Sequence, residues 1–447
     1  MDYPIWDLAV GGGVLIGVIA ILHVCVSHFA VGGGIAMAVG EAIALRRSDA
    51  PLRELLKRSS LMLILVSTVF GALSGVGIWF VIGLVHPTAT SALIHNFVWG
   101  WAIEWAFFLL EVVTALAWYA TWERVRPRTH LLLIVLYAFA AFMSLVIIQG
   151  ILGFMLTPGR WLSTRDFWDG FLNPTYLPGL VFRTGVCIVL AGAFMTLAAL
   201  REKDRAARAR LVRYLAGLEV AGLVLAAAGH RVWEGALPEA VRALFLGAKP
   251  LLPALASTRG LLLGALLVTA VLALLALGLP RFVMWPQAAV ALLAACAVLG
   301  TYERLREGAR KPFVIRDFMF SNGLLVSEID ALNRDGILSK AKWAAHDAGA
   351  TPVSRGRAVY RAECASCHTL DGYLGIRKRT AAADADFLGL FLTALRDDGP
   401  RWSARPPQKP DYPFMPPFVG TDGELSALVT YLDSLKPSQE AEVPRGN

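Results

Sequence analysis

The sequence predicts an all-α protein in which a membrane bundle of eight transmembrane helices precedes a small helical domain. Its composition is the first reason: 56% of the 447 residues are hydrophobic and only 17% are charged. The mean hydropathy of +0.57 is typical of a polytopic membrane protein and not of a soluble domain. The second reason is the order of the chain, because long apolar stretches come first and a polar region with short amphipathic segments follows.

Eight stretches are each long and apolar enough to cross a bilayer, which takes about 20 residues as a helix. They occupy residues 8–45, 61–85, 93–122, 131–156, 177–200, 211–228, 261–279 and 286–302. The first stretch is too long for one crossing, so we expect it to be tilted, to protrude, or to loosen at Gly32, Gly33 and Gly34. The residues before it are acidic and not basic, so we expect an uncleaved membrane segment there.

The basic residues indicate orientation and not a nucleic-acid partner, although the net charge is +8. They follow the first, third and fifth stretches: Arg46, Arg47, Arg53, Lys57, Arg58, Arg124, Arg126, Arg128, Arg201, Lys203, Arg205, Arg208, Arg210 and Arg213. Residues 86–96 contain neither Lys nor Arg. Because basic loops stay in the cytoplasm, both the N-terminus and the region after the eighth stretch are expected on the periplasmic side of a bacterial inner membrane.

The sharpest motif is C-x-x-C-H, formed by Cys364, Cys367 and His368. Two thiols at this spacing attach a c-type haem covalently, and the adjacent histidine can become an axial ligand of the iron. The alternative is a chance pair or half of a zinc site, but the sequence has no second cysteine pair to complete a zinc cage. Haem c is attached outside the cytoplasm, which agrees with the orientation from the basic loops.

The surroundings of this motif resemble a small class I cytochrome c over roughly residues 351–437. A short helical segment at 356–360 leads into the motif, a methionine between prolines follows, and residues 425–435 are expected to form a closing helix. The resemblance implies that Met415 is the second axial ligand, which favours reduced iron; the alternative is that Met415 packs in the core. We therefore expect a membrane domain at 1–327, a linker with amphipathic pieces at 328–350, and a haem c domain at 351–447.

Ionisable residues at membrane depth are costly and indicate function. They are His23, His28, Glu104, Glu111, Arg183, Glu219, His230 and Glu303. Glu104 and Glu111 are seven residues apart and so share one helix face. Each histidine is either a haem ligand or a hydrogen-bonding residue between helices.

Three segments in this order resemble subunit I of the cytochrome bd oxygen reductases. They are residues 22–24 (LHV) with the glycines at 32 and 33, residues 80–83 (FVIG) with 102–104 (AIE) and 106–111 (AFFLLE), and residues 308–317 (GARKPFVIRD). The resemblance implies a helical bundle with about two membrane haems, b or d, near the outer surface, where oxygen is reduced to water.

Carried over residue by residue, the resemblance assigns His23 as the ligand of one membrane haem and Glu104 as the acid beside the oxygen site. Asp317 falls where the family has a glutamate ligand, and aspartate is one methylene shorter. Glu111 lies one residue nearer to Glu104 than the second acid of the family does. Glu104 and Glu111 are the candidates for handing protons on.

Two departures indicate a different route of electron entry. The family holds a low-spin haem beside its quinol site with a histidine and a methionine, whereas Arg183 and Leu261 stand at those positions here. Neither side chain can ligate this iron, so we expect Arg183 to pair with a haem propionate or an acidic neighbour. The loop that shapes the quinol pocket is also missing, and the haem c domain replaces the last helix of the family.

The sequence therefore favours an oxidoreductase that takes electrons from a periplasmic donor, cytochrome c or similar, through covalent haem c and reduces oxygen. Two alternatives stay open: an electron relay without terminal chemistry, or a reductase of another small oxidant such as nitric oxide. Besides membrane lipid, we expect a second membrane subunit or a homodimer as partner. Whether His28, His86, His95 or His230 contacts a haem is also left open.

Overall fold

The computed structural model of the chain separates into two compact units. The described residues are 4–239, 241–242, 253–398 and 415–436. The bundle unit comprises Ile19–Ile78 and Ile94–Ala309, and the second unit comprises Met1–Val18, Trp79–Leu93 and Arg310–Asn447. The C-x-x-C-H motif lies in the second unit.

Eight helices within the described residues are long and apolar enough to span a membrane, which confirms the predicted number. The spans are formed by α1 (Gly12–Arg47), α2 (Ala50–Ile64) with the π-helical η1 (Leu65–Phe70) and α3 (Gly71–Val85), α5 (Val98–Ala120), α6 (Pro127–Leu156), α9 (Tyr176–Ala199), α10 (Arg205–Ala236), α12 (Pro253–Gly278) and α13 (Trp285–Arg310). Shorter helices connect them: α4 (Pro87–Asn96), α7 (Trp161–Thr164), α8 (Phe167–Phe171) and the 3₁₀ turn η2 (Pro280–Phe282).

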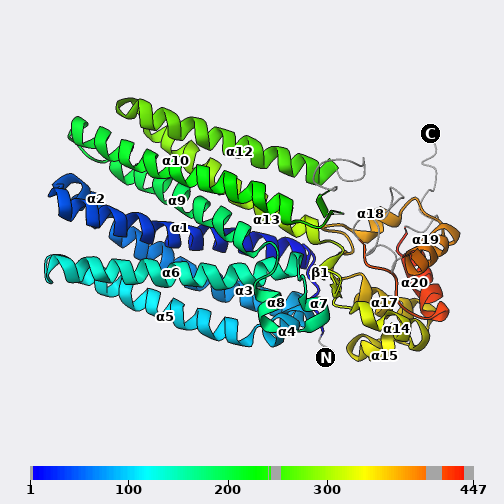
Figure 1. Cartoon of the computed structure of the whole chain (residues 1–447). Helices are drawn as coiled ribbons and strands as arrows, with labels where there is room; N and C mark the ends of the chain where they lie inside the picture. The colour runs from blue at the N-terminus through cyan, green and yellow to red at the C-terminus, as the bar shows by residue number, and fades with distance from the viewer. Residues whose placement is uncertain (1–3, 240, 243–252, 399–414, 437–447) are drawn as a thin grey trace, which may run out of the picture. The chain divides into compact units, whose positions relative to one another are not determined.

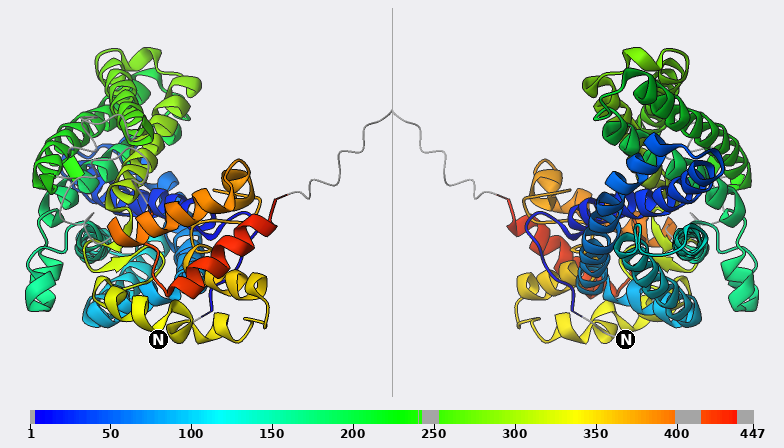
Figure 2. Two further views of the ribbon diagram at one scale, coloured as in Figure 1. Left: turned by 90° about the vertical axis from the view of Figure 1, so that its right-hand side faces the viewer. Right: turned by 90° about the vertical axis from the view of Figure 1, so that its left-hand side faces the viewer.

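Neighbouring spans pack in antiparallel pairs, α5 with α6 and α9 with α10, and α12 lies against α10 (Figure 1). Figure 2 shows the same helices nearly end-on. Local sequence signals fix several helix starts. The Asp49 carboxylate accepts from Leu52 N–H at 3.2 Å, and Asp204 accepts from Ala206 N–H at 2.9 Å, so each acid caps the helix that follows it.

Helix α1 is continuous over 36 residues, so the expectation that it could loosen at Gly32, Gly33 and Gly34 is wrong. A Cβ atom on Gly32 would lie 1.8 Å from the carbonyl oxygen of Cys187 in α9. The glycines therefore permit close approach of neighbouring helices. At 1.5 Å per residue the helix is about 54 Å long, so it must tilt or extend beyond a hydrocarbon core of about 30 Å.

The second unit contains a hairpin and a set of short helices. The strands β1 (Phe313–Ile315) and β2 (Met319–Phe320) pair antiparallel. The helices are η3 (Val326–Glu328), α14 (Ile329–Asp335), α15 (Ile337–Lys340), α16 (Lys342–Ala345), α17 (Pro352–Glu363), α18 (Ile376–Thr380), α19 (Ala385–Asp398) and α20 (Asp422–Ser434). The predicted lead-in and closing helices around the motif correspond to α17 and α20.

Helices α17 and α20 cross closely because Gly356 has no side chain. A Cβ atom there would lie 1.9 Å from the carbonyl oxygen of Ala427. The core around this crossing includes Val359, Tyr360 and Leu428. Ile329, Leu332 and Ile337 of the expected linker join that same core. The apolar side chains of the expected linker thus complete the core of the haem c segment.

Candidate functional site

The C-x-x-C-H segment forms a tight turn directly after α17. Helix α17 begins at Thr351, whose hydroxyl accepts from Ser354 N–H at 3.1 Å, and the helical hydrogen bonding reaches Cys364 N–H, which donates to Tyr360 O at 2.8 Å. His368 N–H then donates to Cys364 O at 2.8 Å. This turn brings the two thiols and the imidazole of the motif together, and both cysteines are free thiols.

The imidazole of His368 is oriented by a backbone carbonyl. Its Nδ1 lies 2.9 Å from Leu374 O, which can only accept, so Nδ1 carries the proton and Nε2 keeps its lone pair. Tyr360 OH donates to His368 O at 2.6 Å and fixes the backbone as well. Burial lowers the pKa of His368, which further favours the neutral imidazole. A neutral histidine held at Nδ1 is the form that ligates a metal through Nε2.

Met415 is half-buried and packs on the core cluster that Cys364 and Ala365 also contact. The three residues directly before it, Tyr412, Pro413 and Phe414, lie outside the described residues. The segment after Met415 is tied to the motif by Glu363, whose carboxyl accepts from Val419 N–H at 3.2 and 3.3 Å. Burial raises the pKa of Glu363 well above its ordinary value, and nearby Glu424 raises it further. Met415 and Cys364 of the motif thus pack against the same core.

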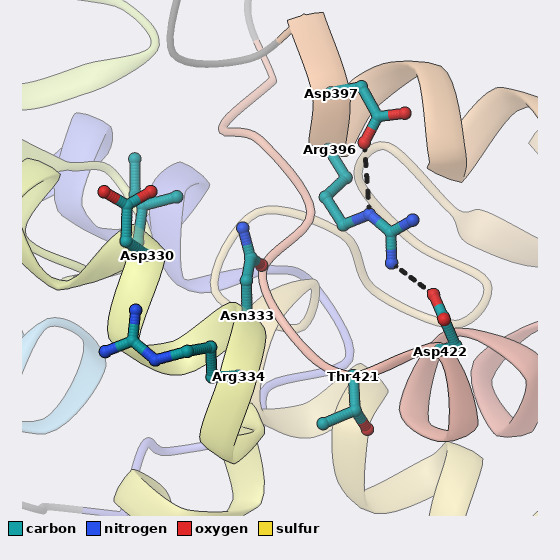
Figure 3. Close-up of a pocket in the computed structure, with 8 residues that line it drawn as sticks. Asp330, Asn333, Arg334, Arg396, Asp397, Thr421 and Asp422 are labelled. Atoms are coloured by element: carbon teal, nitrogen blue, oxygen red, sulfur yellow. Dashed lines mark hydrogen bonds and ion pairs between the residues drawn. The ribbon is translucent and has the colours of Figure 1, made fainter.

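An open groove of about 640 Å³ lies elsewhere in the second unit, between α14, α19 and α20 (Figure 3). Arg396 spans part of it, with bonds to Asp397 at 3.3 Å and to Asp422 at 2.6 Å. None of the haem c residues of the sequence prediction lines this groove. Its exposed ion pairs are ordinary surface contacts of small energetic weight, and we assign no cofactor to it.

His23 in the bundle is held by a partner that the sequence did not reveal. Its Nδ1 lies 3.0 Å from Ser74 Oγ, and the Ser74 hydroxyl donates to Phe70 O at 2.5 Å. Since the serine proton is already used, His23 Nδ1 must donate, which leaves Nε2 with a free lone pair. The arrangement matches that of His368: a neutral imidazole oriented through Nδ1 and able to ligate a metal through Nε2.

Glu104 and Glu111 lie on one face of α5, as their spacing predicts. Glu111 is buried and contacts the hydroxyl of Tyr137 in α6. Glu104 is half-buried and lies beside Ser144, also in α6. The two carboxyls thus face the α5–α6 interface within the bundle unit.

Arg183 is only 1% exposed and sits in a buried charge network. It forms an ion pair with Glu303, and its Nη1 lies 3.2 Å from His28 Nε2. Arg306 Nε lies 3.1 Å from the other oxygen of Glu303. Of the two partners expected for Arg183, the structure shows the acidic neighbour, and it also brings His28 to this site.

Aromatic rings pack beside this network, and the Arg183 guanidinium lies over the Tyr302 ring at 5.4 Å. The rings of Phe182 and Tyr302 are 4.1 Å apart, and those of Trp233 and Tyr302 are 5.3 Å apart. His230 stacks on Trp233 at 5.9 Å. Leu261, at the other ligand position of the low-spin haem, is 61% exposed and carries no donor atom.

Asp317 lies in the turn between β1 and β2, with φ of +57°, a conformation that aspartate tolerates better than most residues. Its carboxyl is paired loosely with Arg316, at 3.7 Å, and its buried Oδ1 has no hydrogen-bond partner. Burial raises the pKa of Asp317. A buried oxygen without a partner is costly, and a cation or metal would satisfy it.

The fold and these residues define a multi-pass helical membrane protein with a c-type cytochrome domain. Residues 14–235 match the family described as cytochrome bd terminal oxidase subunit I, and residues 353–436 match the family described as cytochrome c. The chain thus combines a membrane region similar to cytochrome bd subunit I with a cytochrome c domain. Both families imply haem binding, and they imply oxidoreductase chemistry.

A solved structure supports the fold. The bd oxidase from Geobacillus thermodenitrificans aligns with a TM-score of 0.60 at 15% sequence identity, over 70% of this chain and 90% of that chain. At this identity the likeness concerns the fold alone. A search of curated proteins gives no significant match.

Proposed function

We propose that this protein takes electrons from a periplasmic donor, cytochrome c or similar, through its cytochrome c domain and reduces oxygen to water in the bundle. The observation that carries the proposal is the Arg183–Glu303 pair. It stands where the family needs a histidine ligand for the haem beside the quinol site, and the surrounding aromatic side chains pack closely. Quinol therefore has no electron acceptor at that position, whereas the fused cytochrome c domain offers one.

The residues of the second unit fit haem c. Cys364 and Cys367 are free to attach the porphyrin, and His368 presents Nε2. Met415, which packs on the same core as Cys364, supplies a thioether. A His/Met-ligated haem provides reversible one-electron transfer at a relatively high potential. Glu363 and Val419 flank the two proposed axial ligands in the sequence, and Val419 N–H donates to the Glu363 carboxyl.

The residues of the bundle fit membrane haem, of type b or d, with about two groups expected. Ser74 orients His23 for iron through Nε2. Asp317 lies outside the bundle, in the second unit, and its unpartnered carboxylate oxygen is suited to a second iron. Iron with an open coordination position supplies the oxygen chemistry. Glu104 and Glu111 then have the task of delivering protons, because reduction of oxygen to water consumes them.

The positions of the basic loops support a bacterial inner membrane with the cytochrome c domain on the periplasmic side. A donor then reaches the domain from the periplasm, and protons come from the cytoplasm. A second membrane subunit or a second copy of the chain is expected as partner.

The proposal is tested on the purified, haem-loaded protein. Haem should stay on the polypeptide in a denaturing gel, and carbon monoxide should shift the reduced spectrum of a membrane haem, because an open iron binds it. Reduced cytochrome c or an artificial one-electron donor should drive oxygen uptake. Full haem content without a carbon monoxide adduct or oxygen uptake would overturn the oxidase and favour an electron relay.

A further inference from the structure

Three polar pairs recur at regular steps along the interface of α5 and α6. On α5 they involve Glu104, Glu111 and Trp118, and on α6 His130, Tyr137 and Ser144, each series in steps of seven residues. Because the helices run antiparallel, the pairs are Glu104 with Ser144, Glu111 with Tyr137, and Trp118 with His130. Seven residues are two turns, or about 10.5 Å, so the three pairs extend over about 21 Å of the bundle.

The pair at the end of α5 is completed by Glu41 of α1, and the three residues form a closed hydrogen-bonded ring. Glu41 Oε1 lies 2.6 Å from His130 Nδ1, His130 Nε2 lies 3.0 Å from Trp118 O, and Trp118 Nε1 donates to Glu41 Oε2 at 2.9 Å. Glu41 is 3% and His130 5% exposed. We call this set the Glu41–His130 ring.

The geometry of the ring fixes how many protons it holds. The Trp118 carbonyl can only accept, so His130 Nε2 carries a proton, and the indole N–H satisfies Glu41 Oε2. One further proton must lie between His130 Nδ1 and Glu41 Oε1, on either atom. Without it, the lone pairs of the nitrogen and the carboxylate would face each other at 2.6 Å.

The ring lies at the end of the bundle that carries the basic loops. Glu41 is six residues before the end of α1 at Arg47, Trp118 is close to the end of α5, and His130 is in the first turn of α6. The indole of Trp122 lies against the imidazole of His130, with 4.3 Å between the two centroids. The guanidinium of Arg53, in α2, lies over the Trp122 indole at 5.7 Å from its centroid. In the orientation proposed above, this is the cytoplasmic side.

Further along the interface, buried hydroxyls are available for water. Ser67 and Ser144 both have buried hydroxyl oxygens without a hydrogen-bond partner of normal geometry. They lie beside Tyr137 and Glu104, respectively. Each hydroxyl therefore offers a bonding position for a water molecule beside one of the pairs.

We propose that the Glu41–His130 ring is the cytoplasmic proton-loading site of this chain, which passes protons along the α5–α6 interface toward Glu111 and Glu104. In each step the ring takes one proton from the cytoplasmic side and releases one toward Glu111, so its own charge is restored. The inference rests on the proposed oxygen reduction as the consumer of those protons. Neither residue touches the reacting atoms, and both act by supplying protons.

The test compares Glu41→Gln and His130→Gln with the wild-type protein, all full-length and haem-loaded. A photochemical one-electron reductant reduces the haems anaerobically in weakly buffered solution, and a pH-indicator dye follows proton uptake. Both variants should take up protons at least about tenfold more slowly, because an amide cannot relay a proton. The final amount taken up and the rate of haem c reduction should be unchanged. Oxygen uptake should slow by a similar factor.

Glu219→Gln is the matched control, because Glu219 is also 3% exposed and lies on α10, away from the α5–α6 interface. It should take up protons at the wild-type rate. If Glu41→Gln and His130→Gln are fully loaded with haem and take up protons at the wild-type rate, the inference is overturned. The Glu41–His130 ring is then only a structural contact between helices. The proton measurement needs no oxygen, so a wild-type protein that takes up protons but no oxygen would refute the proposed function separately.

Discussion

The haem c segment and the membrane bundle build similar histidine geometries from very different sequence distances. His368 is oriented by Leu374 O, six residues away, and its motif spans five residues. His23 is oriented by Ser74, 51 residues away, and Arg183 is paired with Glu303, 120 residues away. The first site depends on a local turn, whereas the second depends on helices packing in the correct register.

This contrast implies that the two sites can fail independently. His23→Ala should remove a membrane haem and abolish oxygen uptake, while the haem c spectrum stays intact. Cys364→Ala should give a polypeptide without covalent haem that still shows the spectrum of the membrane haems. The measurements are haem-stained gels, optical spectra and oxygen uptake for each variant. Loss of both spectra in either variant would show that the sites depend on each other.

The buried charge network allows a sharper test of the bundle. Glu303 pairs with both Arg183 and Arg306, so Glu303→Gln leaves the buried Arg183 without a counter-charge and Arg306 with Glu307 alone. This change should lower the free energy of unfolding by about 3–5 kcal/mol. Arg183→Met should cost less, because Arg306 remains paired with Glu303. Thermal unfolding in detergent measures both, and a larger loss for Arg183→Met would contradict the network.

The haem c domain should be most sensitive at its helix crossing. Gly356→Ala places a methyl group 1.9 Å from Ala427 O and must separate α17 from α20. We expect a loss of about 1–3 kcal/mol in that domain, with no change in the membrane haem spectrum. Gly389→Ala is the control, since nothing lies within 4 Å of its Cβ position in α19, and it should be neutral or slightly stabilising. Equal destabilisation by Gly356→Ala and Gly389→Ala would contradict the close crossing of α17 and α20.

The smallest expected effect is a pH dependence confined to the haem c domain. Burial raises the folded-state pKa of Glu363, so between its unfolded and folded pKa values the folded protein binds more protons. Its stabilising contribution is therefore full below the unfolded pKa and is lost as the pH rises through the folded pKa. Glu363→Gln should flatten this decline. The free energy of unfolding of the variant should exceed that of the wild type by at most about 1.4 kcal/mol per pH unit in that window. A free energy of unfolding of this domain that does not fall as the pH rises in the wild-type protein would contradict this prediction.

The sequence was sufficient for whatever depends on composition or short spacing. The number of spans, the helices around the haem c motif and the shared face of Glu104 and Glu111 were predicted correctly. The second span was expected from residue 61 but begins at Ala50, because its first turns carry charged side chains that hide it from a search for apolar residues. The amphipathic pieces at 329–345 were predicted as such, but their periodicity does not say which core they complete.

What the sequence did not reveal are partners across helices. Ser74, Tyr137 and Ser144 are single polar residues in apolar spans, and nothing in their neighbourhood indicates which helix faces them. His130 is bonded to Glu41, 89 residues earlier, and no local sequence pattern indicates this pair. Such pairs depend on helix rotation and register, which are set by close contacts such as that of Gly32 with Cys187.

The central claim is that electrons enter through haem c and not from quinol. The most direct measurement is oxygen uptake by the purified protein with reduced cytochrome c and, separately, with quinol, for the wild type and for Cys364→Ala. We predict uptake with cytochrome c, little with quinol alone, and none with either donor once Cys364 is replaced. Robust quinol-driven uptake that persists in the Cys364→Ala variant would contradict the claim.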